Sequence, residues 1–296
     1  MFDAPPRSSS TVFTRLGEEH VNVDGVSAWL KLQRPGVKAG SFIEGPVFDT
    51  QGYLWFCDIP WGRIFRASPG GDVELVIQYD GEPNGLAFSP DGRLYIADYK
   101  NGLLTLDPAI RKIEIILAEA PDSPFKGLND LIFARNGDLY FTDQGLTGLH
   151  DASGRLFRLR VDGRLDCLLD NVPSPNGLVL APDERSLLLA VTRDNAVWRV
   201  PFLPDGNGVF KVGVFVRLSG GNGPDGLAID AAGNLVVCHL GLGAVWVFDP
   251  HGEPLRRIQS CAGRLTTNAT FGPPRQPGLY ITESDTGSIL RAEVDW

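Results

Sequence analysis

The sequence predicts an all-β fold, a six-bladed β-propeller with four antiparallel strands in each blade. A phrase such as "PNGLAFSPDGRLYIAD" (83–98) recurs along the chain with small changes. The copies start about 40 to 50 residues apart, which is the period of a four-stranded propeller blade. The 296 residues include 35 Gly and 22 Pro, an excess that is typical of many short elements joined by turns.

Six copies of the phrase align on one position at the start of each copy. The copies read "EGPVFD", "NGLAFS", "NDLIFA", "NGLVLA", "DGLAID" and "NATFGP". The aligned residues are Glu44, Asn84, Asn129, Asn176, Asp225 and Asn268. We therefore expect residues 1–296 to form a single propeller domain, with blades that start near these six positions.

Each copy contains the strands of one blade in order. The first strand begins at the aligned residue, and turn residues separate it from an apolar run opened by Gly, as in 52–58, 92–98 and 137–143. A third strand and a weaker fourth strand follow, and no long segment with the 3.6-residue period of a helix competes with this pattern.

The last copy is too short to complete its blade. The chain ends at Trp296, which leaves room for three strands after the copy begins. An open blade would expose unpaired backbone groups along its edge. We therefore expect the N-terminal segment, residues 1–43, to supply the closing strand, from either 11–16 or 26–32.

Composition excludes several classes of partner. The net charge of −9 argues against nucleic acid and against an anionic membrane surface. The sequence shows neither a secretory signal nor a membrane span, and the four cysteines have no C-x-x-C spacing. We expect reduced thiols, a cytoplasmic location and a small-molecule substrate; the oligomeric state is left open.

The aligned residues are predicted to surround the central channel at one end. The first strand of each blade lines the channel, so its start lies on a ring around the axis. Glu44 and Asp225 bring two carboxylates to a ring of Asn amides, an oxygen-rich set that suits Ca²⁺. Mg²⁺, Mn²⁺ and Zn²⁺ stay open as alternatives. The competing interpretation is that Asn or Asp before Gly serves only to form turns.

A second ring is expected where the second strands end, at the same mouth. Its members are Asp58, Asp98, Asp143, Val191, His239 and Glu283. For most of the acidic members we favour a structural capping role. The loops after these strands supply candidate substrate contacts, for which ordinary packing is the alternative: Trp61, Tyr99, Arg193 and His239. A long insert, 144–154, is expected to cover the mouth as a lid or specificity element.

Four of the motifs together resemble a known family. They are "EGPVFD" (44–49), "LNDLIF" (128–133), "PNGLVL" (175–180) and "PDGLAID" (224–230). In this order and spacing they are similar to the calcium-dependent lactonases of the gluconolactonase and regucalcin type, to which diisopropyl fluorophosphatase is related. The resemblance extends over roughly residues 40–290.

The resemblance implies one catalytic divalent cation in the channel. By this resemblance Glu44, Asn176 and Asp225 are metal ligands, and Asn129 is either a direct ligand or a water-mediated or substrate contact. Asp225 is also the candidate general base or nucleophile.

Two features depart from the family pattern. Asn84 and Asn268 lie on the ring without being standard ligands, and Asn84 is assigned to substrate binding. Lys126 stands close to where regucalcin-like members carry a substrate-holding Arg.

The expected activity is opening of a lactone by hydrolysis, with the cation acting as a Lewis acid and with Glu44 and Asp225 as catalytic residues. Two alternatives stay open. One is a phosphotriesterase that uses the same metal site. The other is a non-catalytic propeller that serves as a binding scaffold.

Overall fold

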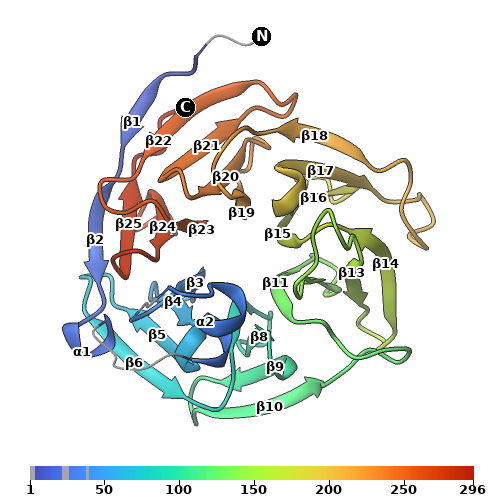
Figure 1. The fold of residues 1–296 in the computed structure, drawn as a ribbon, viewed down its shortest axis with the longest axis horizontal. Coiled ribbons are helices and arrows are strands. Elements are labelled where there is room, and N and C mark those ends of the chain that lie inside the picture. Colours follow the sequence, from blue (N-terminus) through green and yellow to red (C-terminus); the bar gives the residue numbers. More distant parts are fainter. Residues whose placement is uncertain (1–3, 22–26, 38–39) are drawn as a thin grey trace.

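The computed structural model describes residues 4–21, 27–37 and 40–296 of the chain. Within these ranges, six sheets are arranged around a central axis, each with its first strand innermost (Figure 1). Apart from two N-terminal strands at the outer edges of the last two blades, the strands of each blade are antiparallel and follow one another in chain order from the centre outward. The predicted six-bladed propeller is therefore confirmed.

The first three blades each contain four consecutive strands. Blade 1 is formed by β3 (Ile43–Phe48), β4 (Leu54–Asp58), β5 (Arg63–Ala67) and β6 (Val73–Gln78). Blade 2 is formed by β7 (Pro83–Phe88), β8 (Leu94–Asp98), β9 (Gly102–Asp107) and β10 (Lys112–Leu117). Blade 3 is formed by β11 (Leu128–Phe133), β12 (Leu139–Asp143), β13 (Gly154–Leu159) and β14 (Leu165–Val172).

The other three blades continue the pattern. Blade 4 is formed by β15 (Pro175–Leu180), β16 (Ser186–Val191), β17 (Ala196–Pro201) and β18 (Gly213–Arg217). Blade 5 is formed by β19 (Gly223–Ile229), β20 (Leu235–Leu240), β21 (Ala244–Phe248) and β22 (Pro254–Gln259). Blade 6 has β23 (Thr266–Phe271), β24 (Leu279–Glu283) and β25 (Ser288–Ala292) from the C-terminal end of the chain.

The N-terminal segment closes the propeller through two strands. β2 (Thr11–Arg15) pairs antiparallel with β25 and completes blade 6, as expected for 11–16. β1 (Arg7–Ser9) adds a fifth, parallel strand to blade 5 beside β22, which the sequence did not suggest. One short segment thus joins the last two blades and covers the outer edges of both (Figure 1).

The second candidate for the closing strand, 26–32, was wrong in the part that the structure describes. Ala28–Gln33 is a helix, α2, and residue 26 lies outside the described residues. Ser27 caps this helix by accepting a hydrogen bond from the Leu30 backbone N–H. Trp29 and Leu30 are buried against blade residues, so the short helix is held by packing and lies next to the central opening (Figure 1).

The remaining helical elements are short: α1 (Glu18–Val21) and the 3-10 turns η1 (Ile59–Trp61) and η2 (Thr192–Asp194). None of the helices in the described ranges has the length and apolar character needed for a membrane span. Apolar side chains pack between adjacent blades, as the ring of Trp55 in β4 does against that of Phe88 in β7, with 5.7 Å between the ring centroids.

Every inner strand is irregular at its aligned residue. The pairing between first and second strands shifts beside each ring position, for example between Leu128 and Leu131 of blade 3. Similar shifts occur in the other five blades. Such a bulge re-aims side chains next to a site. Because the aligned residues lie inside strands, turn formation does not account for their recurrence.

The Gly that follows most of the aligned residues has a packing role. A Cβ on Gly85 would lie 2.7 Å from the Asp130 Cα on the next inner strand. A Cβ on Gly177 would lie 2.6 Å from the carbonyl oxygen of Asp225. Inner strands of neighbouring blades therefore approach so closely around the axis that a side chain has no space there.

Candidate active site

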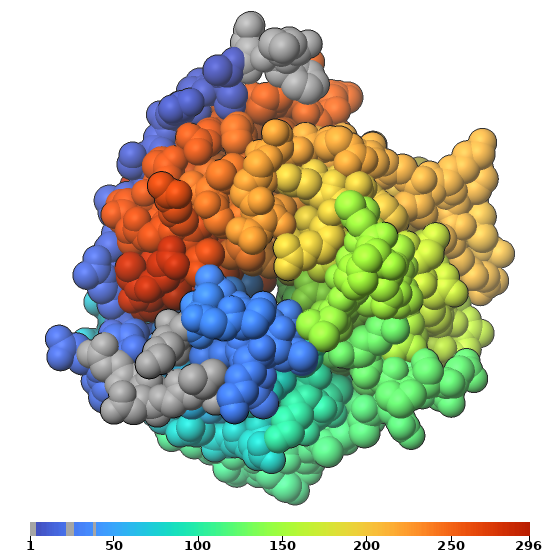
Figure 2. All heavy atoms as spheres, viewed as in Figure 1, coloured from blue at the N-terminus to red at the C-terminus, as the bar shows by residue number. Residues whose placement is uncertain are grey.

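A cavity of about 630 Å³ opens at one end of the channel. Figure 2 shows the hollow near the centre of one face, beside the blue segment that contains α2 and the yellow-green loop of blade 3. Five of the six aligned residues line the cavity, and all five are buried: Glu44, Asn84, Asn129, Asn176 and Asp225. Side chains far apart in the sequence thus surround one space, as the repeat alignment predicted.

The sixth aligned residue, Asn268, is buried but is not part of the cavity lining. Its side-chain nitrogen donates to a carboxylate oxygen of Asp130 at 3.4 Å. Asp130 directly follows the ring position of blade 3 and is also buried. This pair places a third carboxyl group in the channel, which the sequence reasoning did not identify.

The buried carboxyl groups favour their protonated forms in the absence of a cation. Burial, followed by repulsion from Asp225, raises the pKa of Glu44 well above its ordinary value. Burial raises the pKa of Asp225 to about 7, against an opposing effect of the nearby Asn176 side chain. Burial likewise raises the pKa of Asp130 to about 7. Burial therefore disfavours negative charge on these three carboxyl groups, and a positive charge placed among them would favour it.

The amide of Asn129 is oriented by its neighbour Gln144. The Asn129 side-chain nitrogen donates to Gln144 Oε1 at 3.1 Å, and Gln144 Nε2 donates to Ser174 Oγ at 3.1 Å. Thr147 Oγ1 continues the network, since it donates to the Gln144 carbonyl at 2.6 Å and accepts from the Ser174 backbone N–H. With its nitrogen engaged, Asn129 is left with its oxygen as the free acceptor.

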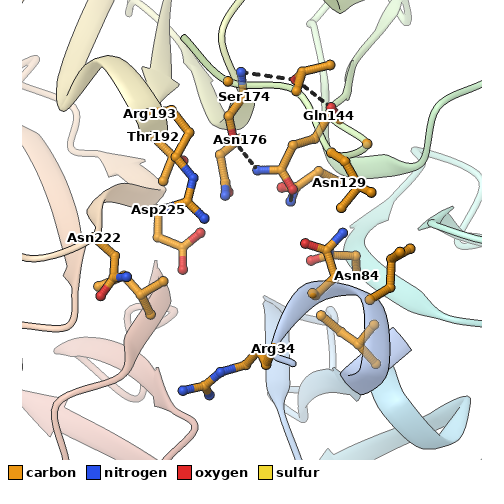
Figure 3. A pocket seen from close by; sticks show the side chains of 18 of the residues that line it. Arg34, Asn84, Asn129, Gln144, Ser174, Asn176, Thr192, Arg193, Asn222 and Asp225 are labelled. Atoms are coloured by element: carbon orange, nitrogen blue, oxygen red, sulfur yellow. Dashed lines mark hydrogen bonds between the residues drawn. The ribbon is translucent and has the colours of Figure 1, made fainter. Parts of the chain in front are cut away.

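The carboxylate and amide oxygens of the ring fit a divalent cation that prefers oxygen ligands. Figure 3 shows the side chains of Asn84, Asn129, Asn176 and Asp225 directed toward the same space. Among the described residues, no three His, Cys, Asp or Glu side chains converge to hold a metal ion. Amide oxygens must therefore complete any coordination that begins with the two ring carboxylates, as is common for Ca²⁺.

The insert of blade 3 forms one wall of the cavity. Residues 144–150, from the loop between β12 and β13, all contribute to the lining. Leu146 and Leu149 are 52% and 71% exposed, so they present apolar surface at the mouth. The expected location of this loop at the mouth is therefore confirmed. Lys126, which precedes Asn129, does not line the cavity.

The residues expected to contact substrate divide into two groups. Asn84 and Arg193 line the cavity, and the Arg193 guanidinium extends toward Asp225 (Figure 3). Trp61 and Tyr99 instead pack beneath α2 in the apolar cluster around Trp29. They therefore support a wall of the cavity without reaching its lining.

His239 lies apart from the cavity, although it is the last residue but one of β20, the second strand of blade 5. It is fully buried, its Nε2 is 2.9 Å from the Gly220 carbonyl, and its Nδ1 accepts from Trp246 Nε1 at 3.3 Å. Burial lowers the pKa of His239. These contacts describe a neutral imidazole that joins a loop to blade 5.

The acidic ends of second strands have the capping role that the sequence analysis favoured. Asp58 Oδ1 accepts the backbone N–H of Phe42 at 2.7 Å, and Asp143 Oδ1 accepts that of Gly127 at 2.9 Å. Asp98 is bound in the same way by nearby backbone N–H groups. Each carboxylate thus fixes the segment that leads into the inner strand of its own blade.

Sequence reasoning missed several side chains of the site, and only some had left a signal. Asp130 occupies the position where four other copies carry Gly, which marks blade 3 as different. Gln144 directly follows the predicted second strand of that blade. Arg34 and Asn222, which also line the cavity, had no signal in the repeat pattern.

Fold and site together define a propeller with a polar, oxygen-lined cavity at one end of its channel. The sequence matches the SMP-30/Gluconolactonase/LRE-like region over residues 42–285. The chain therefore belongs to the SMP-30/gluconolactonase/LRE-like family, as the motifs indicated.

Two curated relatives and two solved structures illustrate the similarity. A gluconolactonase of Zymomonas mobilis is 32% identical over 286 residues, covering 85% of this chain and 78% of that protein. Lactonase drp35 of Staphylococcus aureus is 27% identical over 261 residues, covering 84% of this chain and 78% of that protein. The structure of a Xanthomonas campestris gluconolactonase has a TM-score of 0.75 at 25% identity, with 85% of each chain covered. Regucalcin from Agrobacterium tumefaciens, described as a calcium-binding protein, has a TM-score of 0.75 at 23% identity, over 96% of this chain and 95% of that one.

Proposed function

We propose that the protein is a lactone hydrolase that uses a divalent cation, with Ca²⁺ as the first candidate, bound at the ring. One observation carries this proposal: Glu44, Asn129, Asn176 and Asp225, from four different blades, line one cavity in a member of this family. The relatives named gluconolactonase and lactonase support the choice of a cyclic ester as substrate.

The four side chains would hold the cation through oxygen atoms. A divalent cation bound there supplies Lewis acidity, which polarises an ester carbonyl and offsets negative charge on its oxygen. Glu44 and Asp225 provide the charge, while Asn129 and Asn176 provide neutral oxygens. The Gln144 hydrogen bond directs the Asn129 oxygen toward the cavity.

Asp225 is proposed to handle the proton of the reaction. The oxygen of a water molecule adds to the carbonyl carbon, and one proton of that water moves to the Asp225 carboxylate. The ring C–O bond then breaks, and the proton passes to the departing oxygen, so that the product is a hydroxy acid. Arg193 attracts Asp225 through space and favours its charged form between turnovers.

The test is a hydrolysis panel of sugar lactones, simple lactones, aryl esters and one phosphotriester, with and without chelator. We expect the wild-type protein to hydrolyse lactones and chelation to abolish this activity. Asp225→Ala should reduce turnover by at least about a thousandfold. Glu44→Gln should need a higher calcium concentration than the wild-type protein to reach comparable turnover. Faster turnover of the phosphotriester would favour the phosphotriesterase alternative. Unchanged lactone hydrolysis after chelation and in both variants would refute the proposed mechanism, and no turnover at all would favour the binding scaffold.

A further inference from the structure

Three exposed leucines lie at the mouth of the cavity. Leu32, Leu146 and Leu149 are 50%, 52% and 71% exposed, and all three belong to the cavity lining. Every other leucine of the described ranges is at least partly buried. Single apolar side chains are common on protein surfaces, but a group of them at the opening of a cavity indicates contact with a ligand. We call these three residues the leucine rim.

Exposure separates this rim from the polar floor of the cavity. The five ring residues that line the cavity are between 4% and 7% exposed, whereas the leucines of the rim are at least half exposed. Two buried side chains, Phe42 and Ile59, add further apolar surface to the lining. A substituent that extends from an ester bound at the ring toward solvent would therefore pass the leucine rim.

The insert of blade 3 holds Leu149 at the tip of a tight turn. Backbone hydrogen bonds of 2.8 and 3.0 Å between Gly148 and Asp151 close this turn. His150, the other residue at the tip, is also exposed and lines the cavity. Because the backbone of the turn is fixed, a ligand at the mouth meets a preformed apolar side chain, which limits the entropy lost on binding.

The polar side chains on either side of Leu146 are engaged within the protein. The Gln144 amide accepts from Asn129 and donates to Ser174, and the Thr147 hydroxyl donates to the Gln144 carbonyl. Leu146 is the most exposed residue of the stretch 144–148. This part of the insert therefore offers an apolar side chain to a ligand at the mouth.

The third leucine of the rim comes from a separate segment, the helix α2. Leu32 follows Trp29 by three positions, so both residues lie on the same face of the helix. Trp29 is buried and lines the cavity, which directs this face toward the channel. Figure 2 shows the segment that contains α2 and the insert of blade 3 next to the hollow. Apolar side chains thus reach the mouth from two segments far apart in the sequence.

The charged and amide side chains of the mouth lie elsewhere around the opening. Arg193 belongs to η2 of blade 4 and Asn222 to the segment before β19 of blade 5, and the two lie together (Figure 3). Arg34 extends from the end of α2 away from Asn84 (Figure 3), and Asp285 of blade 6 attracts it through space. The polar contacts available at the mouth are therefore grouped apart from the leucine rim.

We propose that the leucine rim binds an apolar substituent of the substrate, an alkyl chain carried by the lactone. This inference rests on the proposed lactonase function and names the substrate class: a lactone with an alkyl chain on the carbon that bears the ring oxygen. A sugar lactone presents hydroxyl groups instead, which would lose water without gaining hydrogen bonds from leucine side chains. Each methylene group that leaves water for such contacts corresponds to about two- to fourfold in kcat/KM.

A series of lactones with the same ring size tests the proposal. δ-Valerolactone, δ-hexalactone, δ-octalactone and δ-decalactone share one ester ring and differ only in the length of the alkyl chain. Dividing each kcat/KM by the rate constant for hydrolysis by hydroxide removes differences in intrinsic reactivity. We expect the corrected value to rise at least about thirtyfold from δ-valerolactone to δ-decalactone and to exceed that of glucono-δ-lactone.

Variants assign the preference to the leucine rim. The double variant Leu146→Asn/Leu149→Asn should lower kcat/KM for δ-decalactone at least about tenfold more than that for δ-valerolactone. Both side chains are exposed, so the fold should tolerate the change, which thermal unfolding checks. Ile110→Asn is the matched control: it removes a 68% exposed apolar side chain from the turn between β9 and β10, at the end of the blade away from the cavity, and should alter neither rate.

The outcomes separate this inference from the proposed function. Corrected rates that do not rise with chain length, a preference for glucono-δ-lactone, or an equal loss on both lactones in the double variant overturn the role of the rim and leave the lactonase intact. If no lactone is hydrolysed, calorimetric titration with the hydroxy acids from δ-decalactone and δ-valerolactone, in the presence of calcium, decides. Binding of the longer acid that is at least about tenfold tighter, and that the double variant loses, supports the rim; equal binding or no binding overturns it.

Discussion

The stabilising effect of a divalent cation should depend on pH, because Asp225 must lose its proton to bind the cation. Burial raises the pKa of Asp225 in the cation-free fold to about 7, whereas an unfolded Asp titrates near about 3.9. Between these two pKa values the folded state holds a proton that the unfolded state has lost, so the free energy of unfolding falls as pH rises. The stabilising contribution of the protonated Asp225 is nearly gone above pH 7. Glu44, whose pKa is also raised, acts in the same direction.

The magnitude follows from linkage. Between pH 6 and pH 8 the contribution of Asp225 to the free energy of unfolding falls by about 1.4 kcal/mol. In a chain of this length that lowers the midpoint of thermal unfolding by about 2 to 4 °C. Calcium at about a hundred times its dissociation constant adds about 2.7 kcal/mol at pH 8. At pH 6 proton competition at Asp225 alone weakens binding about tenfold, so the same calcium concentration adds at most about half as much.

The assay is differential scanning calorimetry of the wild-type protein and of Asp225→Asn, each with chelator and with calcium at pH 6 and pH 8. The variant retains Asp130 and every histidine, so the difference between the two proteins reports Asp225 together with its repulsion of Glu44. We expect cation-free Asp225→Asn to be more stable than cation-free wild type at pH 8, and to gain little from calcium. An equal calcium effect on the wild-type protein at both pH values, or a full effect on the variant, would refute the reasoning.

Three further predictions concern positioning and packing. Gln144→Leu removes the acceptor for the Asn129 amide and should weaken calcium binding about tenfold to a hundredfold by calorimetry, whereas Gln144→Glu, which keeps an acceptor, should bind at near wild-type strength. Gly85→Ala places a Cβ 2.7 Å from the backbone of the next inner strand and should lower the free energy of unfolding, measured in urea, by about 3 kcal/mol or more. The control Gly213→Ala, whose Cβ meets no atom within 4 Å, should leave stability nearly unchanged. Equal losses of stability in the two variants would contradict the packing role of Gly85. His239→Gln should lower stability by about 1 to 3 kcal/mol without changing KM, so a large rise in KM would restore His239 as a substrate contact.

The blade architecture could be predicted because its signals are local and repeated. Strand pattern, turn residues and spacing recur within each copy, and the short last copy required a closing strand from the N-terminal segment. Where the signal was weak the prediction was wrong or incomplete. The run at 26–32 alternates poorly and forms α2 over the described part, and the parallel pairing of β1 with blade 5 has no counterpart in the repeat.

The residues of the cavity lining could be predicted where they occupy the same position in each copy of the repeat. Five aligned side chains meet because every blade places its inner strand in the same way around the axis. The roles of single side chains in the loops were less accessible to this reasoning. Trp61, Tyr99 and Arg193 follow comparable strands, yet only Arg193 reaches the cavity.

The number of blades, their closure by the N-terminal segment and the ring of oxygen-bearing side chains can be inferred from the amino-acid sequence, because these properties depend on a period along the chain. The residues from outside the repeat that join the ring around the cavity are known only from the folded structure. Gln144, Arg34 and Trp29 come from an insert and from a helix that lie outside the repeat. Their placement depends on packing between distant segments, and no period in the sequence encodes such contacts.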